Sequence, residues 1–382
     1  MRQSGIHVAI DAEPLRPPRT GIGRYVLELG RALESEPAIA RVSPLATVRL
    51  AENLDHARAL LGSATRPDGF PGARLTAGIA RRARRAFLGP VIRRSGVDLF
   101  HGPNYALPRL RIPAVVTVHD LSHLYYPETH PAHRVHYLRR VLPRALDRAA
   151  AVITVSEAVR REVIAEFRFP ADRVHAVPNG VSPSFVPGAP DRARLAGYGL
   201  ESDGYLLAVG TLEPRKNLPN LLAAHARLPA ALRRRFPLVV VGARGWRDAL
   251  LQRELERAVA RGDAVQPGYV PDADLAHLYA GARAVAYPSR YEGFGLPVLE
   301  AMACAAPTLT SNRGALLEVA GDAALAVDPD DALALADGLH RILTDERLRA
   351  HLRQAGPQRA NAYAWSATAA GTAAVYAAAL ER

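Results

Sequence analysis

Two glutamates whose spacing could serve a sugar-binding site lie in the segment 289–303, which reads SRYEGFGLPVLEAMA. The apolar run 284–287 before this segment predicts a short buried strand. Pro297 suits the first turn of a following helix, where its missing N–H group costs nothing. We therefore expect Glu292 on the loop before the helix and Glu300 near the end of the first helical turn.

Two glycines and the helix start complete this element. Gly293 and Gly295 lie between the two acids and allow the backbone to approach a bulky ligand closely. The free N–H groups at the start of a helix favour an anion. Together these features suit a sugar joined to a phosphate. By themselves they are equally compatible with an ordinary strand–loop–helix connection that carries two surface acids.

A basic turn supplies cations that would match such a phosphate. The segment 211–217, TLEPRKN, separates a predicted strand from a predicted helix and contains Arg215 and Lys216. An arginine fork and a lysine point charge beside free helix amides suit a diphosphate, although a solvated basic turn is the alternative. The location at a strand end favours function, and so does the fact that Lys216 is the only lysine in the chain.

The first half of the chain contributes a histidine and a helix start that contains glycine. His119 lies at the end of the predicted strand 114–120 and could contact a reacting sugar or carry a proton. The sequence around Gly21, Gly23 and Arg24 predicts a helix start that a phosphate or an acceptor could approach. It is a weak dinucleotide-binding motif, because about nine residues separate it from the preceding strand.

Composition limits the class of protein. The 382 residues suggest two or three domains, and 49% hydrophobic content indicates a soluble globular chain. Apolar runs are too short for a membrane span or a signal peptide, so we expect a cytoplasmic protein. The single cysteine, Cys304, excludes an internal disulfide framework and is expected in the core. The histidines match no metal-ligand spacing, so we expect no metal site.

Strand-like and helix-like segments alternate through both halves of the chain, which predicts two doubly wound α/β units. One strand is expected over residues 42–50. A stretch rich in proline and glycine, 182–204, is interpreted as the passage between the units. We expect an N-terminal domain over 1–182, a C-terminal domain over 183–364 and a final helix within 365–382.

The net charge is +12, and nearly all of the positively charged residues are arginines. Two predicted helices, 73–94 and 133–150, carry much of this charge. They could lie on an anionic membrane or could simply expose a solvated basic face. A nucleic-acid-binding protein is a different class that a basic chain allows, but no basic motif with interleaved aromatic residues supports it.

Six segments, in their order along the chain, make this sequence resemble a retaining glycosyltransferase of the GT-B fold. The family is the large one that includes bacterial mannosyl- and rhamnosyltransferases of polysaccharide assembly. The segments are 20–25 (TGIGRY), 118–120 (VHD), 177–181 (VPNGV), 213–217 (EPRKN), 292–300 (EGFGLPVLE) and 318–323 (EVAGDA). The resemblance covers nearly the whole chain. It implies two Rossmann-like domains that face each other across a cleft, with the C-terminal helix crossing back to the first domain.

The resemblance implies that the second domain binds the donor. Glu292 would face the hexose, Glu300 would hold the nucleotide ribose, and Arg215 and Lys216 would clamp the diphosphate. Many relatives have an arginine where this chain has Thr211, so more of the diphosphate charge would rest on the basic pair. Further donor contacts are implied for Gly293 and for the amides of Phe294, Gly295 and Leu296.

The first domain would bind the acceptor, with Gly21, Gly23 and Arg24 on the acceptor side of the cleft. His119 would approach the donor sugar from this domain. The implied activity is transfer of a hexose from a nucleotide diphosphate-sugar to a glycan or lipid-linked acceptor in cell-surface polysaccharide synthesis. Lipopolysaccharide is one such polysaccharide. The resemblance favours mannose, or a deoxyhexose such as rhamnose, and a GDP-sugar over a UDP-sugar.

The implied chemistry retains the anomeric configuration and uses neither a metal nor a cofactor. The leaving diphosphate would deprotonate the acceptor on the same face of the sugar, without a covalent intermediate. Peripheral contact with the inner face of the cytoplasmic membrane, through the basic helices, is part of this expectation. The alternative within the same fold is a soluble synthase that acts on a sugar phosphate.

Overall fold

The computed structural model describes residues 5–17, 21–47, 49–62, 88–242 and 249–382. The chain forms two compact units. The first comprises Met1–Leu121, His136–Gly180 and Trp365–Arg382, and the second comprises Ser122–Val135 and Val181–Ala364. The short segment Ser122–Val135 thus groups with the second unit, although it lies within the sequence range expected for the N-terminal domain.

The first unit is built on a seven-stranded sheet in the order β3-β2-β1-β4-β5-β6-β7. Neighbouring strands are parallel except β2 and β3. The expectation of one strand over 42–50 is wrong, because Thr47 adopts a positive φ of 58° and the chain turns back there. The strands are β1 (Ile6–Asp11), β2 (Ile39–Ala46), β3 (Arg49–Leu50), β4 (Leu99–Gly102), β5 (Ala114–Val118), β6 (Ala151–Thr154) and β7 (Val174–Ala176).

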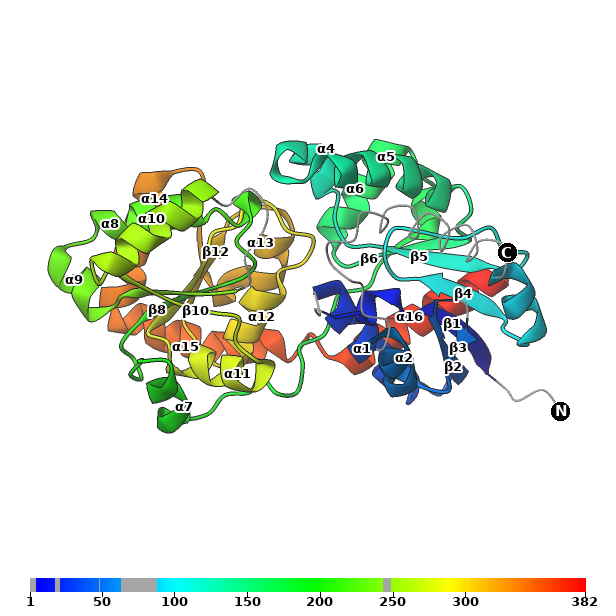
Figure 1. Ribbon diagram of the computed structural model, residues 1–382, viewed down its shortest axis with the longest axis horizontal. Coiled ribbons are helices and arrows are strands. Elements are labelled where there is room, and N and C mark those ends of the chain that lie inside the picture. Colours follow the sequence, from blue (N-terminus) through cyan, green and yellow to red (C-terminus); the bar gives the residue numbers. More distant parts are fainter. Residues whose placement is uncertain (1–4, 18–20, 48, 63–87, 243–248) are drawn as a thin grey trace, which may run out of the picture. The chain divides into compact units, whose positions relative to one another are not determined.

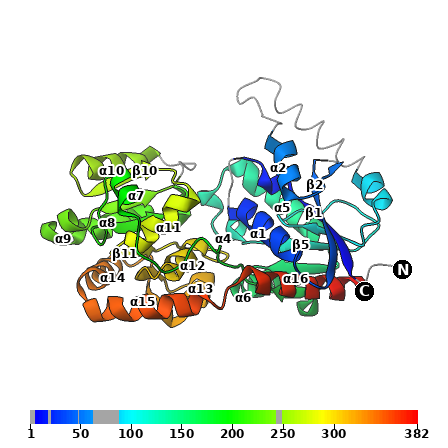
Figure 2. The same cartoon turned by 90° about the horizontal axis from the view of Figure 1, so that it is seen from below.

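Helix α16 (Trp365–Leu380) belongs to the first unit and packs beside α1 (Gly21–Leu33), as Figure 2 shows. Its sequence is mostly alanine, glycine and threonine, and such small side chains let a neighbouring helix and the sheet approach closely. The C-terminal helix therefore returns to the first sheet, as expected. The other helices are η1 (Glu13–Leu15), α2 (Leu54–Gly62), α5 (Ala132–Leu146), α6 (Glu157–Phe167) and η3 (Ala171–Arg173).

The predicted basic helix 73–94 can be compared with the structure only in part. Residues 88–94 are helical, and residues 63–87 lie outside the described part of the chain. The second predicted basic helix, 133–150, corresponds to α5, which ends at Leu146. Its first residues, up to Val135, are grouped with the second unit.

The second unit contains a six-stranded sheet in the order β10-β9-β8-β11-β12-β13, and every neighbouring pair is parallel. This is the order of a doubly wound nucleotide-binding fold, in which the chain switches direction between the first and fourth strands. The switch point here lies between β8 and β11. The strands are β8 (Leu206–Val209), β9 (Leu238–Val241), β10 (Ala264–Gly268), β11 (Ala284–Tyr287), β12 (Thr308–Ser311) and β13 (Leu325–Val327).

Helices cover both faces of the second sheet (Figure 1). A buried apolar cluster joins the strands to α8 (Leu218–Arg227), α10 (Ala249–Ala260) and α14 (Ala332–Thr344). The other elements of this unit are α4 (Ser122–Tyr125), η2 (Pro127–Thr129), α7 (Arg192–Gly197), η4 (Pro214–Lys216), α9 (Ala230–Arg235), α11 (Asp272–Gly281), α12 (Leu296–Ala303), α13 (Gly314–Ala320), η5 (Gly321–Ala323) and α15 (Glu346–Ala360).

Two further features bear on the sequence expectations. Within the described ranges, no helix is both long enough and apolar enough to cross a membrane. Cys304 is buried at the end of α12, where burial raises the pKa of its thiol to about 12. Its position is therefore that of a core residue, as expected.

Candidate active site

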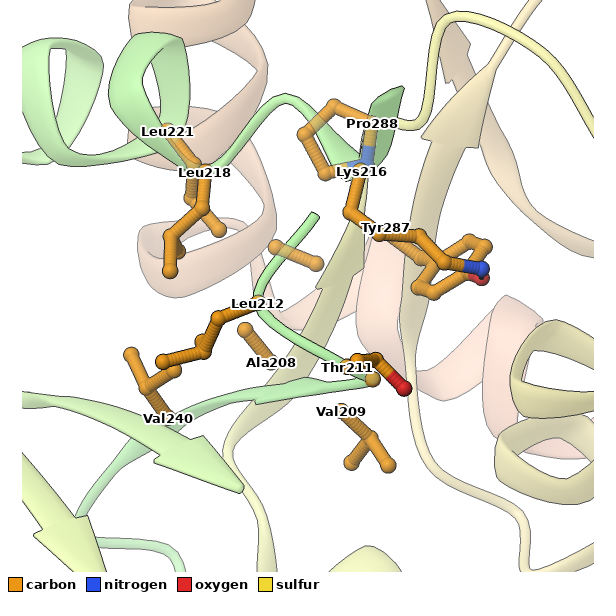
Figure 3. Close-up of a pocket in the computed structure, with 12 residues that line it drawn as sticks. Ala208, Val209, Thr211, Leu212, Lys216, Leu218, Leu221, Val240, Tyr287 and Pro288 are labelled. Carbon is orange, nitrogen blue, oxygen red and sulfur yellow. Dashed lines mark hydrogen bonds between the residues drawn. The ribbon is translucent and has the colours of Figure 1, made fainter. Parts of the chain in front are cut away.

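The polar groups of the second unit gather at the carboxyl ends of β8 and β11. A small pocket opens there, lined by Gly210 and Thr211 after β8, by Lys216, and by Tyr287 and Pro288 at the end of β11 (Figure 3). Parallel sheets bind ligands at the carboxyl ends of their strands, at the point where the strand order reverses. The pocket occupies this position.

Glu292 is the centre of the hydrogen-bond network beside the pocket. Its Oε2 accepts a hydrogen bond from Nη1 of Arg215 at 2.8 Å. Its Oε1 accepts from Nζ of Lys216 at 2.7 Å and lies 2.9 Å from the hydroxyl of Tyr287 and 2.7 Å from that of Ser289. The Glu292 side chain is only 10% exposed. Both carboxylate oxygens are therefore bound to cations within the protein.

This arrangement sets the ionisation state of Glu292. Burial by itself would raise the pKa of the carboxyl group, because a buried charge loses its hydration. The charges of Arg215 and Lys216, together with the hydrogen bonds from Lys216 and Ser289, outweigh burial and lower the pKa to about 2. The carboxylate is therefore ionised throughout the neutral range and is already stabilised by its partners.

Lys216 also contacts the end of β11 directly. Its Nζ donates to the hydroxyl of Tyr287 at 2.5 Å and lies 5.2 Å from the centroid of that ring (Figure 3). Burial raises the pKa of Tyr287 well above its usual value, with a further contribution from the charge of Glu292. The phenol thus stays protonated and can accept from the ammonium group while it donates to the carboxylate.

The loops after β8 and β11 are fastened to one another. The backbone N–H of Arg290 donates to the carbonyl of Arg215 at 3.0 Å, and Nη1 of Arg215 donates to the carbonyl of Tyr291 at 2.6 Å. Nδ2 of Asn217 donates to the carbonyl of Pro288 at 3.1 Å, from a residue held at a φ of 62°. These bonds fix the basic turn against the loop that carries Glu292.

Glu213 gives Arg215 a second acidic neighbour. Nη2 of Arg215 donates to Oε2 of Glu213 at 3.5 Å, and both side chains are about nine-tenths buried. Burial raises the pKa of Glu213, and the charges of Lys216 and Arg215 oppose this effect. Arg215 therefore lies between two acids, of which Glu292 is the more firmly ionised.

The loop–helix element that follows Glu292 has a sharp entry. Gly295 precedes α12 with a φ of 108°, a conformation that residues with a Cβ atom rarely adopt. A Cβ atom there would lie 2.6 Å from Cδ2 of Leu316. Phe294 is buried against the ring of Tyr363, and Leu296 begins the helix. Gly293 is also buried in this loop.

Glu300 lies on the buried side of α12 and is 3% exposed. The hydroxyl of Tyr279, on α11, donates to its Oε2 at 3.2 Å. The predicted ribose-binding acid is therefore held by the neighbouring helix. It takes part in a contact separate from the one that joins Glu292 to Arg215 and Lys216.

His119 belongs to the first unit and follows β5 directly. Its Nε2 lies 2.7 Å from the carbonyl oxygen of Pro103. Its ring is edge-on to that of Tyr25, with 4.9 Å between centroids, and lies 6.0 Å from that of Tyr105. Burial lowers the pKa of His119, and the Pro103 carbonyl and the Asp120 charge only partly oppose this effect. The imidazole is therefore neutral at pH 7.

A buried hydrogen-bond chain supports the surroundings of His119. The hydroxyl of Tyr376 on α16 lies 2.7 Å from Nδ1 of His101 on β4. Nε2 of His101 lies 2.7 Å from Oγ1 of Thr117 on β5, which in turn lies 3.1 Å from the hydroxyl of Tyr25 on α1. Burial lowers the pKa of His101 to about 3, so this histidine is neutral. The chain ties the C-terminal helix to the helix that packs on His119.

The predicted acceptor-side residues lie at the start of α1, also in the first unit. Gly21 is exposed, and a Cβ atom there would meet no other heavy atom within 4 Å. Gly23 is buried, whereas Arg24 is partly exposed. The structure thus brings Arg215, Lys216 and Glu292 into direct contact and places His119, Gly21, Gly23 and Arg24 in the other unit.

Three members of the site were not among the predicted residues, namely Glu213, Tyr287 and Ser289. Tyr287 and Ser289 flank Pro288 at the end of β11, and polar groups at a strand end were the signal that identified His119. The same signal was present here. Glu213 lies inside the recognised EPRKN segment, but nothing local in the sequence shows that its side chain turns toward Arg215.

Residues suited to a metal ion are not gathered anywhere in the part of the chain that the structure describes. No group of three or more histidine, cysteine, aspartate or glutamate side chains is arranged there to hold one. The positive charges nearest to Glu292 in this site belong to Arg215 and Lys216.

Two family models match this chain. The model "Glycosyltransferase Family 4" matches residues 19–185, and the model "Glycosyl transferases group 1" matches residues 197–359. The chain is 38% identical over 367 residues to the O-antigen chain mannosyltransferase B of Escherichia coli, covering 92% of this chain and 94% of that one.

A second mannosyltransferase is similar in sequence, and a solved structure is similar in fold. The serotype-specific mannosyltransferase WbdA of Escherichia coli is 30% identical over 288 residues, which span 70% of this chain and 34% of that longer protein. The sucrose-phosphate synthase of Thermosynechococcus elongatus shares the fold, with a TM-score of 0.74 at 22% identity over 98% of both chains. The chain therefore belongs to the GT-B glycosyltransferases, with a family 4 amino-terminal half and a group 1 carboxyl-terminal half.

Proposed function

We propose that this enzyme transfers mannose from a nucleotide diphosphate-mannose, GDP-mannose being favoured, to a glycan or lipid-linked acceptor in the synthesis of a cell-surface polysaccharide. The observation that carries the proposal is the contact of Arg215 and Lys216 with Glu292 at the switch point of the second sheet. The mannosyltransferase relatives support the choice of sugar.

In this proposal the basic pair binds the donor diphosphate. Arg215 offers a planar fork of N–H donors and Lys216 a compact charge, and both suit phosphate oxygens. In the structure these donors are directed at Glu292 instead. A bound diphosphate would compete with the carboxylate for the same N–H groups. Glu292, relieved of part of this pairing, would then accept hydrogen bonds from hydroxyl groups of the donor hexose.

Glu300 is proposed to hold the nucleotide ribose. Gly293 and the amides of Phe294, Gly295 and Leu296 are proposed to line the path of the sugar and the phosphate. The second unit is thereby assigned to the donor, and the first unit, with Gly21, Gly23 and Arg24, to the acceptor. His119, neutral at pH 7, is proposed to contact the donor sugar through a ring nitrogen.

The proposed reaction retains the anomeric configuration. The bond between the anomeric carbon and the diphosphate oxygen breaks, and its electron pair leaves with the phosphate. The acceptor oxygen bonds to the same face of that carbon, and the acceptor proton passes to the departing phosphate oxygen. The enzyme mainly positions the reactants and stabilises the developing charge.

A covalent route through Glu292 is disfavoured by the state of this residue. A glycosidase-like double displacement requires a carboxylate that attacks the anomeric carbon. Both oxygens of Glu292 are held by cations in this structure, and in the proposed donor complex they would turn to hydroxyl groups of the hexose, so neither oxygen is left to attack the anomeric carbon. We therefore assign Glu292 to orientation of the sugar.

A thermal-shift panel tests the donor assignment. Wild-type protein is mixed with GDP, UDP, ADP and TDP and with the corresponding nucleotide sugars. We expect GDP and GDP-mannose to raise the melting temperature, and Lys216→Ala to abolish the shift. A strong shift with UDP alone would overturn the choice of base. No shift with any nucleotide would overturn the assignment of the site.

Peripheral binding to the inner face of the cytoplasmic membrane is proposed from the exposed arginines of α5, which are Arg139, Arg140 and Arg144. Sedimentation with liposomes tests it. Binding to vesicles with anionic lipid, weakened by added salt, supports the membrane-associated acceptor. An enzyme that stays in the supernatant would favour a soluble acceptor such as a sugar phosphate.

A further inference from the structure

Three tyrosine rings meet beside Glu292 in the second unit. Tyr291 immediately precedes Glu292, and its ring centroid lies 5.9 Å from that of Tyr125 and 5.5 Å from that of Tyr126. We refer to Tyr125, Tyr126 and Tyr291 as the tyrosine cluster. It joins the segment that follows His119 in the sequence to the loop that carries Glu292.

Hydrogen bonds within the segment 122–130 hold Tyr125 and Tyr126 in place. Nε2 of the buried His130 lies 2.8 Å from Oγ of Ser122, and the N–H of Tyr126 donates to the carbonyl of Ser122 at 2.8 Å. The hydroxyl of Thr129 donates to the carbonyl of Tyr126 at 2.7 Å. With the segment held in this way, Tyr125 stays 39% exposed. The core therefore does not use this aromatic surface in full.

Tyr291 is fixed by the site itself. One guanidinium nitrogen, Nη1 of Arg215, donates both to the carbonyl of Tyr291 at 2.6 Å and to Oε2 of Glu292 at 2.8 Å. Any shift of the Tyr291 backbone would thus disturb the contact between Arg215 and Glu292. The cluster is held at a set position next to the proposed sugar-binding acid.

The charge around the cluster favours a neutral ligand. Arg290 precedes Tyr291 in the sequence, and Arg313 lies close enough to Tyr126 to interact with it electrostatically. Both guanidinium groups are paired with Asp330, that of Arg290 at 2.7 Å and that of Arg313 at 2.6 Å. Arg313 is also paired with Asp328 at 2.6 Å. Because these guanidinium groups are bound to carboxylates, they offer little net charge for a phosphate.

A tyrosine side chain has an apolar ring face and a polar hydroxyl group. A pyranose likewise has apolar C–H groups and polar hydroxyl groups. Its C–H groups can pack on the ring face while its hydroxyl groups reach the phenol oxygens. Ligand pockets commonly combine aromatic walls with a few polar groups in this way. The ring of an acceptor must also lie next to the donor hexose, since reacting atoms approach within about 3 to 3.5 Å.

We propose that the tyrosine cluster is a stacking subsite for the terminal pyranose of the acceptor saccharide. The assignment rests on the proposed function, which places the donor hexose at the adjacent Glu292. Tyr125 contributes exposed ring surface, and Tyr291 connects the subsite to the acid. The acceptor would therefore be recognised in part by the second unit.

The variants Tyr125→Ala and Tyr125→Phe test the proposal. Tyr137→Ala is the matched control, because Tyr137 lies on α5 and is 47% exposed. The substrates are GDP-mannose and a mannobiose acceptor. Loss of the Tyr125 ring is expected to raise the acceptor KM about 3- to 10-fold, the range for one aromatic contact. The donor KM and the hydrolysis of GDP-mannose by water should be unchanged. Tyr125→Phe keeps the ring and loses only the hydroxyl, so it should raise the acceptor KM less than Tyr125→Ala does. Tyr137→Ala should behave like the wild type.

A binding measurement without the donor separates this proposal from the proposed function. Saturation-transfer NMR with mannobiose should show transfer from wild-type protein to the sugar C–H protons, and weaker transfer with Tyr125→Ala. Unchanged saturation transfer, or an equal loss of donor hydrolysis and sugar transfer, would overturn the stacking subsite. If mannobiose binds as expected but no nucleotide sugar is turned over, the proposed function fails while the subsite stands.

Discussion

Nζ of Lys216 lies 2.7 Å from Oε1 of Glu292, although 76 positions separate the two residues in the sequence. The contact brings together the turn after β8 and the loop after β11. Because Arg215 binds the other carboxylate oxygen at 2.8 Å, the acid is neutralised by two cations. In the proposed donor complex, a diphosphate would have to compete with this carboxylate of the protein for the same two cations.

Substitution of either member of this pair should abolish most of the sugar transfer. We expect Lys216→Ala and Glu292→Ala each to lower kcat/KM by about 100-fold or more, the scale of one lost charge-stabilising group. Circular dichroism should show a retained fold. Arg227→Ala removes an exposed cation from α8 and serves as the control, with near-normal turnover. Near-normal turnover of either site variant would refute the assignment.

The stability of the protein should fall in acid because of Glu292. The pKa of this group is lowered from 4.5 to about 2 in the folded protein, so folding favours the ionised form. Its contribution is present above about pH 4.5 and is lost as the pH falls toward about 2. At about 1.4 kcal/mol per pKa unit, the loss amounts to about 3 kcal/mol.

Urea unfolding of wild type and Glu292→Gln across this pH range measures the effect. The glutamine variant lacks the titration, so the difference in unfolding free energy between the two proteins should shrink as the pH falls. A difference that stays constant with pH would show that the carboxylate is not preferentially ionised in the folded state.

The buried chain in the first unit should make Tyr376 important for stability. Removal of its hydroxyl leaves Nδ1 of His101 without the partner that now lies at 2.7 Å. We expect Tyr376→Phe to lower the free energy of unfolding by about 1 to 3 kcal/mol, the cost of an unsatisfied buried polar group. Tyr137→Phe, on an exposed ring, should change it by less than about 0.5 kcal/mol. Equal stability of the two variants would contradict this role.

Gly242 should be required because it supports the turn that leads to the basic pair. A Cβ atom there would lie 2.0 Å from the carbonyl oxygen of Gly210, at a φ of 155°. Gly242→Ala should therefore lower the unfolding free energy by about 1 to 3 kcal/mol and weaken nucleotide binding. Gly197→Ala, where no other heavy atom lies within 4 Å of the added Cβ, is the control for calorimetry and nucleotide titration. If Gly242→Ala and Gly197→Ala had the same stability and the same nucleotide affinity, the backbone at Gly210 would be able to move away from the added Cβ atom at no cost.

The parts of the fold that follow from local sequence could be predicted. Apolar runs with strand and helix periods predicted the alternation in both units. The prediction of one strand over 42–50 was wrong, because the chain turns at Thr47 within an otherwise strand-like run. Turn residues other than glycine and proline give a weaker local signal.

The sequence by itself predicted most of the elements and singled out the residues that we propose for the chemistry, since both predictions rest on patterns of neighbouring residues. It placed Arg215 and Lys216 on a turn and Glu292 on a loop before a helix. Only the tertiary structure decided that these groups touch, that Tyr287 and Ser289 join them, and that Tyr125 meets Tyr291. The contacts of Glu292 with Arg215 and Lys216 depend on β8 pairing with β11, and the order of strands in a sheet is set by packing between segments far apart in the chain.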